Sequence, residues 1–272
     1  MFKKCALIIQ DFFDTIFDLY SEGDASKAKK FFRSSKESNE LFLGYTEGFP
    51  RGNGNSEESL SQVFEFVHRK GLLETDIVGR LEDFHLFVPD FGRDLMSDLV
   101  ASLIKEELVN FTKIQCQEHN IPTTYKIKRP YWNGKLHKWD QLTDTVPEIN
   151  GNPIVLVPKV ILVDHYLYDA TKYWQQVVSV WRQKKHKEEN SILHQNRGKY
   201  SKYASKKEIE RVEIKESDIT KKEYLIDMTR QEHSLIRNFR RNIINTQRGS
   251  NSNKMTDNDF EDFIKNSYKK VV

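Results

Sequence analysis

The stretch from Phe84 to Pro122 constrains the fold of this chain more than any other. It begins with an apolar run over 84–88, crosses a polar junction at 89–94, and then shows apolar residues at helical spacing. The spacing predicts a strand over 84–88 and a long, buried helix over 95–119, which Pro122 ends. A strand that leads directly into a buried helix is typical of an α/β domain.

The rest of the pattern alternates helices with short strands. Apolar residues at helical spacing predict helices over 5–21, 25–33, 56–70 and 166–187, and another from Ser217 to about Ile244. Short apolar runs predict strands over 41–45, 123–128 and 154–163, with a tight turn at Asn150-Gly151. The sequence therefore predicts an α/β fold, a mixed sheet flanked by helices.

Charge is distributed unevenly along the 272 residues. From residue 182 onward the chain has 22 Lys and Arg against 14 Asp and Glu, whereas the rest has 21 against 26. The basic C-terminal third indicates either a polyanionic partner or a solvated, lysine-rich helical surface. We expect an α/β core over 1–187, a polar linker over 188–205, and a basic, mostly helical extension over 206–272 with a partly disordered tail.

Nothing in the sequence predicts a membrane segment. No apolar run approaches the roughly 20 residues that span a bilayer. The only cysteines are Cys5 and Cys116, which give no disulfide framework. These features predict a cytoplasmic protein that does not contact a membrane.

Three aspartates, Asp90, Asp94 and Asp98, fall within nine residues at the junction before the 95–119 helix. Such carboxylates can bind Mg²⁺, which prefers oxygen ligands and keeps several waters. The alternative is structural, because Asp94 can be the N-cap of the helix and Asp98 can favour the positive end of its dipole.

Lys159, at the end of the predicted strand 154–163, suggests how such a metal site could hydrolyse a phosphodiester. In nucleases with an Asp and an acid-x-Lys pair, the metal activates water and the lysine orients it. With Asp98, Lys159 would form the catalytic pair. The second acid is absent, however, because Val157 stands two residues before Lys159.

Several cationic residues of the C-terminal third are candidate contacts to a phosphate backbone. These are Arg182, Lys184, Lys185, Arg237, Arg240 and Arg241. A second candidate is the segment Tyr131–Trp139, in which aromatic and basic residues alternate. It can stack on bases, or it can be a β-turn at Asn133-Gly134 whose tryptophans pack inward.

Three further segments carry a family resemblance. They are Asp94-x-x-Ser97-Asp98-Leu99, Gln115-Cys116-x-x-His119-x-Ile121-Pro122, and Gly151-x-Pro153-Ile154-x-Leu156-Val157-Pro158-Lys159. Together they resemble an uncharacterised bacterial protein family associated with phage-defence gene clusters. The resemblance implies a bacterial cytosolic protein that works with a protein partner from the same gene cluster.

Three functional hypotheses follow. The first is a Mg²⁺-dependent nuclease-like effector of antiphage defence, with Asp90, Asp94 and Asp98 as metal ligands. The second is a non-catalytic subunit of a defence complex that binds nucleic acid or a partner. The third is an effector acting on a small nucleotide held by the Gly52–Gly54 loop, since a glycine-rich loop before a helix can bind an anion.

Overall fold

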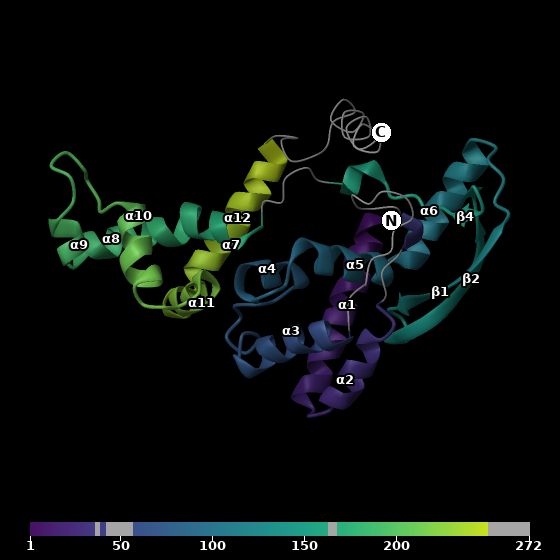
Figure 1. Ribbon diagram of the computed structural model, residues 1–272, viewed down its shortest axis with the longest axis horizontal. Coiled ribbons are helices and arrows are strands. Elements are labelled where there is room, and N and C mark those ends of the chain that lie inside the picture. The colour runs from purple at the N-terminus through teal and green to yellow at the C-terminus, as the bar shows by residue number, and fades with distance from the viewer. Residues whose placement is uncertain (36–38, 42–56, 163–167, 250–272) are drawn as a thin grey trace. The chain divides into compact units, whose positions relative to one another are not determined.

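The computed structural model describes residues 1–35, 39–41, 57–162 and 168–249 (Figure 1). The fold is α/β, as predicted, with helices in the majority. In the described residues the chain forms two compact units. Unit 1 contains the described parts of 1–69 and 91–162, and unit 2 contains 70–90 and 168–249.

Unit 1 contains an aromatic core. Its helices are α1 (Phe2–Ser21), α2 (Ala25–Phe32), α3 (Glu57–Arg69), α5 (Arg93–Leu103) and α6 (Lys105–Glu118). The inner face of α1 places Phe12 against Phe32, Phe64 and Trp132, with ring centroids 4.9–6.4 Å apart. Edge-to-face contacts of this kind add to the stabilisation from burying the rings themselves. The predicted helices 5–21, 25–33 and 56–70 are thereby confirmed.

A long antiparallel hairpin completes unit 1. Its strands are β1 (Tyr125–Asn133) and β2 (Lys138–Val146), and Figure 1 shows the hairpin beside α6. Trp132 and Trp139 are cross-strand partners that pack inward, so the β-turn interpretation of segment 131–139 is confirmed. A second, two-residue hairpin joins β3 (Glu148–Ile149) to β4 (Asn152–Pro153).

The Asn150-Gly151 turn of that small hairpin is as predicted. Its φ values of +51° and +76° are those of a type I′ turn, which Asn-Gly adopts readily. The strand predicted over 154–163 does not form. Instead, the backbone N–H of Leu156 donates to the hydroxyl of Thr112 at 2.8 Å, and residues Lys159–Ile161 make a short 3₁₀ helix, η3.

Two expectations about residues 84–119 are wrong. The predicted strand 84–88 is a helical turn, α4 (Phe84–Phe87), whose residues are all buried. A short, continuous apolar run does not distinguish a buried strand from a buried helix. The predicted helix 95–119 is interrupted at Ile104, where φ −92° and ψ 18° separate α5 from α6.

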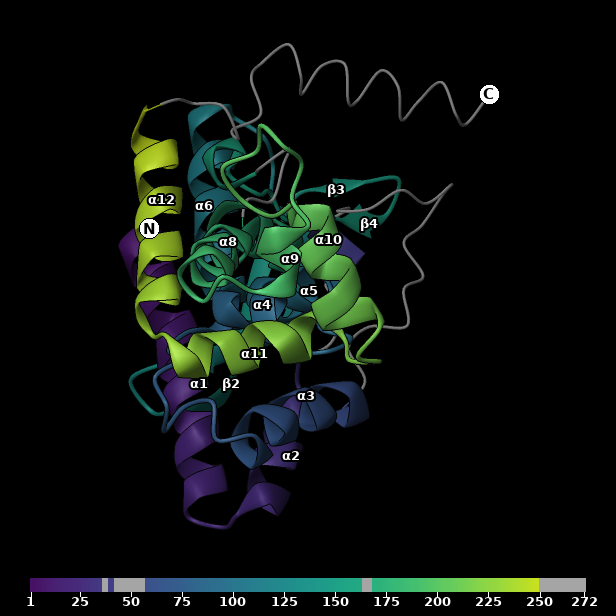
Figure 2. The same ribbon diagram turned by 90° about the vertical axis from the view of Figure 1, so that its left-hand side faces the viewer.

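Unit 2 is helical in its described part. The chain passes through α7 (Ala170–Tyr173), the π-helical turn η4 (Trp174–Val178), α8 (Ser179–Glu188), α9 (Ile192–Gln195), α10 (Lys206–Glu210) and a second π turn, η5 (Arg211–Lys215). It ends with α11 (Lys221–Gln231) and α12 (Ser234–Gly249), which meet at a sharp angle in Figure 2. The single helix predicted from 217 to 244 is therefore two helices. Thr220 and Glu223 form a capping box at the start of α11.

A buried carboxylate ties the two chain segments of unit 2 together. Asp83 is fully buried, and its Oδ2 accepts hydrogen bonds from the backbone N–H groups of Gly79 (2.9 Å) and Arg80 (3.2 Å). Arg240 of α12 pairs with the same oxygen at 2.7 Å, and Tyr168 donates to Oδ1 at 2.5 Å. Both carboxylate oxygens are thus satisfied, as a buried charge requires.

Unit 1 has a comparable polar cluster around Glu40. Its Oε1 lies 2.7 Å from Nζ of Lys105 and 3.3 Å from Nε of Arg129. The backbone carbonyl of Glu40 also accepts a hydrogen bond from Val155 at 2.8 Å. The cluster fastens the short 3₁₀ helix η1 (Asn39–Leu41) to α6 and β1.

The units do not follow the division expected from the sequence. The helical segment 170–188 groups with residues 206–249 in unit 2, although the expected core ran to residue 187. Residues 188–205, expected to be a linker, contain α9 and belong to the same unit. The composition of this segment is polar because its side chains face solvent, and polarity alone does not distinguish a linker from a folded surface segment.

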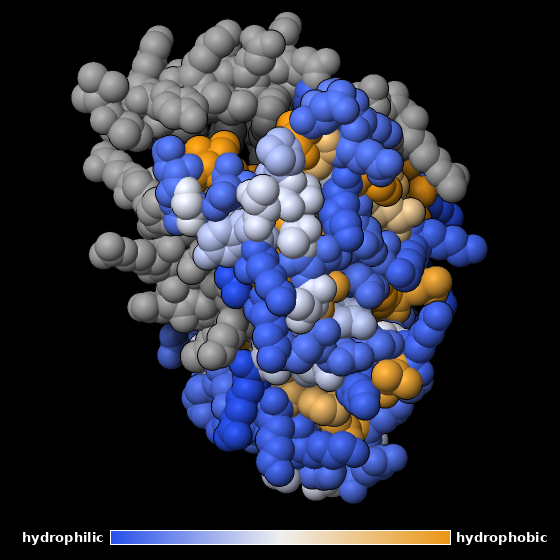
Figure 3. All heavy atoms as spheres, turned by 90° about the vertical axis from the view of Figure 1, so that its right-hand side faces the viewer, coloured by the Kyte–Doolittle hydropathy of each residue, from blue (hydrophilic) through white to orange (hydrophobic). Residues whose placement is uncertain are grey.

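The face of the molecule drawn in Figure 3 is largely hydrophilic. On the face in Figure 3, hydrophobic side chains form small groups separated by hydrophilic ones. Within the described residues, no helix is long and apolar enough to cross a membrane. The predicted strand 41–45, the Gly52–Gly54 loop and the tail beyond residue 249 fall, wholly or mostly, outside the described residues.

Candidate functional site

The predicted acidic site does not form a cluster of three carboxylates in the described part of the chain. Asp94 and Asp98 lie one turn apart on α5 in unit 1, whereas Asp90 belongs to unit 2. Asp90 and Asp94 are exposed, and Asp90 has a φ of +55° in the turn before α5. No group of three or more His, Cys, Asp or Glu side chains that could hold a metal occurs among the described residues. The Mg²⁺ site remains a prediction.

The structural roles proposed for these aspartates need one correction. Gly92, and not Asp94, is the N-cap of α5. Asp94 lies in the first turn, where its charge favours the positive end of the helix dipole. Lys159 begins η3 with a half-buried side chain.

The predicted basic residues divide into two groups. Arg182 and Arg240 turn inward, to Glu213 and to Asp83, and their side chains are only 16% and 18% exposed. Lys184, Arg237 and Arg241 are exposed, and Lys185 lies 3.3 Å from Glu188. The first two arginines therefore stabilise unit 2, and the other four face or border solvent.

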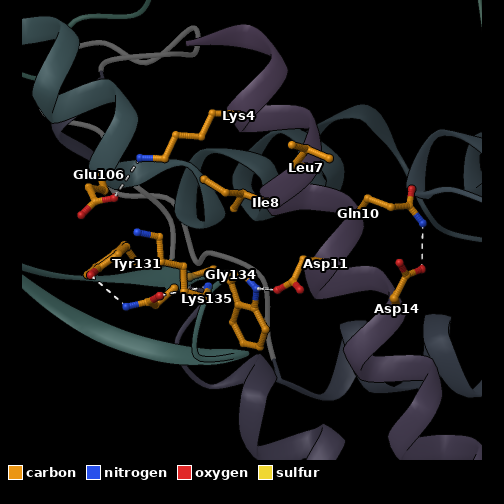
Figure 4. Close-up of a pocket in the computed structure, with 12 residues that line it drawn as sticks. Lys4, Leu7, Ile8, Gln10, Asp11, Asp14, Glu106, Tyr131, Gly134 and Lys135 are labelled. Atoms are coloured by element: carbon orange, nitrogen blue, oxygen red, sulfur yellow. Dashed lines mark hydrogen bonds and ion pairs between the residues drawn. The ribbon is translucent and has the colours of Figure 1, made fainter.

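One pocket of about 650 Å³ opens in unit 1 between α1 and the tip of the β1–β2 hairpin (Figure 4). Figure 4 shows its charged groups paired within the wall: Lys4 with Glu106, and Asp14 with Gln10. The carboxylate of Asp11 accepts a hydrogen bond from the indole of Trp132 at 2.6 Å and lies 2.6 Å from Nδ1 of His137. The carboxylate of Asp11 thus holds the hairpin tip on α1.

Unit 2 displays an aromatic and basic surface that the sequence analysis did not identify. Residues 190–204, here called the aromatic-basic segment, contain three Lys or Arg and no Asp or Glu. Tyr200 is 94% exposed, the most exposed large hydrophobic or aromatic side chain of the described residues. Lys199 and Lys202 are also exposed.

The cations of this segment lie beside its tyrosine rings. Nζ of Lys199 is 5.7 Å from the centre of the Tyr200 ring, and Nζ of Lys202 is 5.4 Å from that of Tyr203. Nζ of Lys187, at the end of α8, lies 5.5 Å from the centre of the same Tyr203 ring. Cations at these distances are attracted to the ring faces. The segment therefore presents positive charge and flat aromatic surface together.

The segment is folded against unit 2 rather than extended from it. Arg197 donates to the carbonyl oxygens of His194 and Ser201, each at 2.9 Å. Gln183 of α8 donates to the carbonyl of Ala204 at 2.5 Å, and Ala204 is buried. These hydrogen bonds fix the backbone of the loop on either side of the exposed Tyr200.

Next to this segment, Glu213 in the π turn η5 contacts several side chains. It accepts hydrogen bonds from Arg182, whose Nε lies 2.9 Å away, and from the hydroxyl of Tyr224. Burial raises the pKa of Glu213, but these two hydrogen bonds and the charge of Arg182 outweigh it, so the pKa is lowered overall. Glu213 is thus a carboxylate fixed in its ionised form.

Residues 1–169 match a family described as Domain of unknown function (DUF8370). The chain belongs to this family. No curated protein and no solved structure matches it. The part of the chain that matches DUF8370 includes the three aspartates and Lys159, whereas the aromatic-basic segment lies beyond it. The surface of unit 2 is therefore a property of this chain that DUF8370 membership does not describe.

A signal in the sequence could have found this surface. Arg197, Lys199 and Lys202 alternate with Tyr200 and Tyr203 over seven residues. This is the same kind of alternation that drew attention to residues 131–139, but those tryptophans are cross-strand partners in a hairpin core. Polar content and length favoured a linker, and only the structure shows that the segment is folded and its tyrosine exposed.

Proposed function

We propose that this protein binds single-stranded nucleic acid through the aromatic-basic segment of unit 2. The observation that carries the proposal is the exposed Tyr200, fixed on a folded loop between lysines and without a nearby acidic residue in the sequence. Exposed aromatic rings stack on unpaired bases, and lysines beside them contact the phosphates. Binding of nucleic acid is the part of the second sequence-based hypothesis that this proposal keeps.

Exposed cations elsewhere in unit 2 would extend the phosphate path. Lys184, Arg237 and Arg241 are exposed, and all three were predicted as backbone contacts. Phosphate contacts increase affinity without reading sequence, so we expect little sequence preference. Duplex binding is less well supported, because a stacking tyrosine needs unpaired bases.

A cytoplasmic setting, a role in antiphage defence and a protein partner from the same gene cluster belong to the same proposal. The two described cysteines are free and buried, which supports a reducing compartment. The metal-dependent nuclease remains a prediction from Asp90, Asp94, Asp98 and Lys159, and no cluster of carboxylates in the described residues favours it.

The test is a binding titration of the full chain with a fluorescently labelled single-stranded 20-mer, read by anisotropy at several salt concentrations. Tyr200→Ala should weaken binding about 5- to 100-fold, the loss expected for one base-stacking contact. Lys199→Ala with Lys202→Ala should also lower the salt dependence, by about 0.7 in slope for each phosphate contact removed.

Matched controls lie on β1 of unit 1. Lys126→Ala with Lys128→Ala removes the same charge from exposed positions, and binding should fall far less. Equal losses in the two double variants would indicate that net charge alone attracts the strand. Absence of salt-dependent binding to single strands by the unmodified chain would refute the proposal.

A further inference from the structure

Three polar side chains of unit 2 contact one another in the order Glu213, His186 and Ser191. The hydroxyl oxygen of Ser191 lies 2.8 Å from Nδ1 of His186, within hydrogen-bond distance. On the other side of the ring, Nε2 of His186 lies 2.8 Å from Oε1 of Glu213, an ion-pair distance, although its N–H is not aligned for a hydrogen bond. His186 is buried, whereas Ser191 is only partly buried.

The turn at the end of α8 brings Ser191 and His186 together. Asn190 takes a φ of +45°, which Asn tolerates, and the backbone N–H of Ser191 donates to the carbonyl of His186 at 3.0 Å. The backbone N–H of Asn190 donates to the backbone carbonyl of Lys187 at 3.2 Å, which completes a Schellman motif. This turn reverses the chain, so the Ser191 hydroxyl lies beside Nδ1 of a histidine five residues before it.

Glu213 is held in place from the other side. Arg182 and Tyr224 both donate to it, and it lies in the π turn η5, an irregularity often found at functional sites. If the Ser191 hydroxyl donates to Nδ1, neutral His186 carries its proton on Nε2, which faces Glu213. That is the arrangement in which a carboxylate stabilises the imidazolium formed when histidine accepts a proton.

We propose that Ser191 is a nucleophile activated by His186, whose protonated ring is stabilised by the charge of Glu213, and that it acts on the phosphodiester of a bound single strand. A nucleophile within hydrogen-bond reach of a base recurs in covalent catalysis. The carboxylate 2.8 Å from the other ring nitrogen supplies a negative charge that favours the imidazolium. The choice of substrate rests on the proposed function. It is supported by the position of Ser191 at the start of the aromatic-basic segment, three residues before His194, whose carbonyl oxygen Arg197 binds.

The step balances without a metal or a redox partner. The Ser191 oxygen attacks phosphorus, its proton passes to Nδ1 of His186, and the bond from phosphorus to the leaving strand oxygen breaks. His186 then returns the proton to that oxygen. The products are a seryl phosphodiester on one strand end and a free hydroxyl on the other, and water attacking the seryl ester by the reverse path restores the serine.

Ser191 also has a structural role, so the experiment must separate the two. Its side chain caps α9 by accepting a hydrogen bond from the backbone N–H of His194 at 3.3 Å. Ser205 occupies the corresponding position before α10 without such a hydrogen bond. Ser205→Ala is therefore a matched control that changes a serine at a helix start but not the His186 contact.

The first measurement uses a tagged fluorophosphonate, which forms an Oγ–P bond with activated serines and releases fluoride. Peptide mapping of the full chain should place the label on Ser191, with at least tenfold less label in Ser191→Ala and none lost in Ser205→Ala. His186→Asn keeps a polar atom near the serine but removes the base, and it should reduce labelling to a similar extent. Labelling of the unmodified chain no greater than that of Ser191→Ala would overturn the proposal.

The second measurement tests the substrate class with an end-labelled single-stranded oligonucleotide on a denaturing gel. The unmodified chain should give a covalent adduct or a cleaved strand, and Ser191→Ala should give neither while still binding the oligonucleotide. Fluorophosphonate labelling with no strand chemistry would overturn nucleic acid as the substrate. Labelling of Ser191 in a chain that binds no oligonucleotide would refute the proposed function separately, and leave Ser191 a nucleophile for another phosphoryl compound.

Discussion

Each unit holds a glutamate paired with cations, buried in unit 1 and partly buried in unit 2, and the two clusters differ in how they end. In unit 1, Glu40 and Lys105 have side chains only 2% and 3% exposed, and Arg129 closes the cluster. In unit 2, Glu213 is 15% exposed and leads through His186 to the partly buried Ser191. The first cluster joins chain segments and presents no reactive group. The second has the same charge pairing, and it also reaches the surface at a nucleophile.

The electrostatics of the two glutamates are nevertheless alike. Burial raises the pKa of Glu40, but the charges and hydrogen bonds of its neighbours, chiefly Lys105, outweigh burial and lower it overall. Burial in turn lowers the pKa of Lys105 despite its acidic partner. The pKa of Glu213 is also lowered overall. A shifted pKa therefore does not distinguish a structural cluster from a catalytic one. The distinction rests on whether the cluster ends at a nucleophile, as the Glu213 cluster ends at Ser191.

The largest effect should come from breaking the closed cluster. Glu40→Ala leaves Lys105 buried without its carboxylate and should destabilise the protein by about 3–5 kcal/mol. Urea unfolding followed by circular dichroism measures the change. The double variant Glu40→Leu with Lys105→Met removes both charges and should recover much of the loss, since an apolar pair leaves no buried charge. A double variant as unstable as Glu40→Ala would show that the cluster itself, and not its unpaired charge, supports unit 1.

Breaking the Asp83 cluster of unit 2 should have the next largest effect. Arg240→Ala removes the ion pair of a fully buried carboxylate and should cost about 3 kcal/mol, although Tyr168 and two backbone N–H groups still bind Asp83. Arg241→Ala, one residue along on an exposed position, should change stability by less than about 0.5 kcal/mol. Thermal unfolding compares the two, and equal effects would show that Arg240 does not stabilise unit 2 through Asp83.

Arg240 and Arg241 show what a sequence does and does not predict. Charge asymmetry placed both in a basic extension, but sequence spacing does not reveal that Asp83, far away in the chain, lies beside Arg240. The sequence also does not show which unit a residue joins. Asp90 belongs to unit 2, whereas Asp94 and Asp98 belong to unit 1. The metal site predicted from their closeness in sequence stays a prediction.

Local patterns were more reliable where a single interaction decides the outcome. Asn150-Gly151 predicted its turn, and apolar periodicity predicted α1, α2 and α3. Periodicity was not sufficient for residues 84–88, where every side chain is buried. It also missed the break at Ile104, because the apolar pattern continues through it. The contact between Ser191 and His186 depends on the φ of Asn190, which the sequence permits but does not require.

Glu213→Gln should have a smaller effect, about 1–3 kcal/mol at neutral pH, because the amide keeps part of the hydrogen bonding with Arg182 and Tyr224. The pH dependence gives the sharper test. Because folding lowers the pKa of Glu213, its stabilisation is complete above the ordinary value of 4.5 and is lost as the pH falls through the lower folded-state value. The stability difference between the two proteins should therefore shrink on acidification, as denaturant unfolding at pH 7 and pH 3 can measure. A difference that grows towards pH 3 would contradict an ionised Glu213 in the folded protein.

The smallest effect on stability should come from replacing Ser191, the partly buried serine of the Glu213 cluster. Ser191→Ala removes the cap of α9 and should cost about 1 kcal/mol, whereas Ser205→Ala, which removes no capping hydrogen bond, should change stability by less than about 0.5 kcal/mol. Thermal unfolding at neutral pH resolves the two. A cost above about 3 kcal/mol for Ser191→Ala would mean that the serine, like Glu40, belongs to a structural cluster whose loss unfolds its surroundings. A cost near the value for a cap would mean that unit 2 retains its fold without the hydroxyl, so that any loss of reactivity in the same variant reports the chemistry of Ser191 and not the loss of its unit.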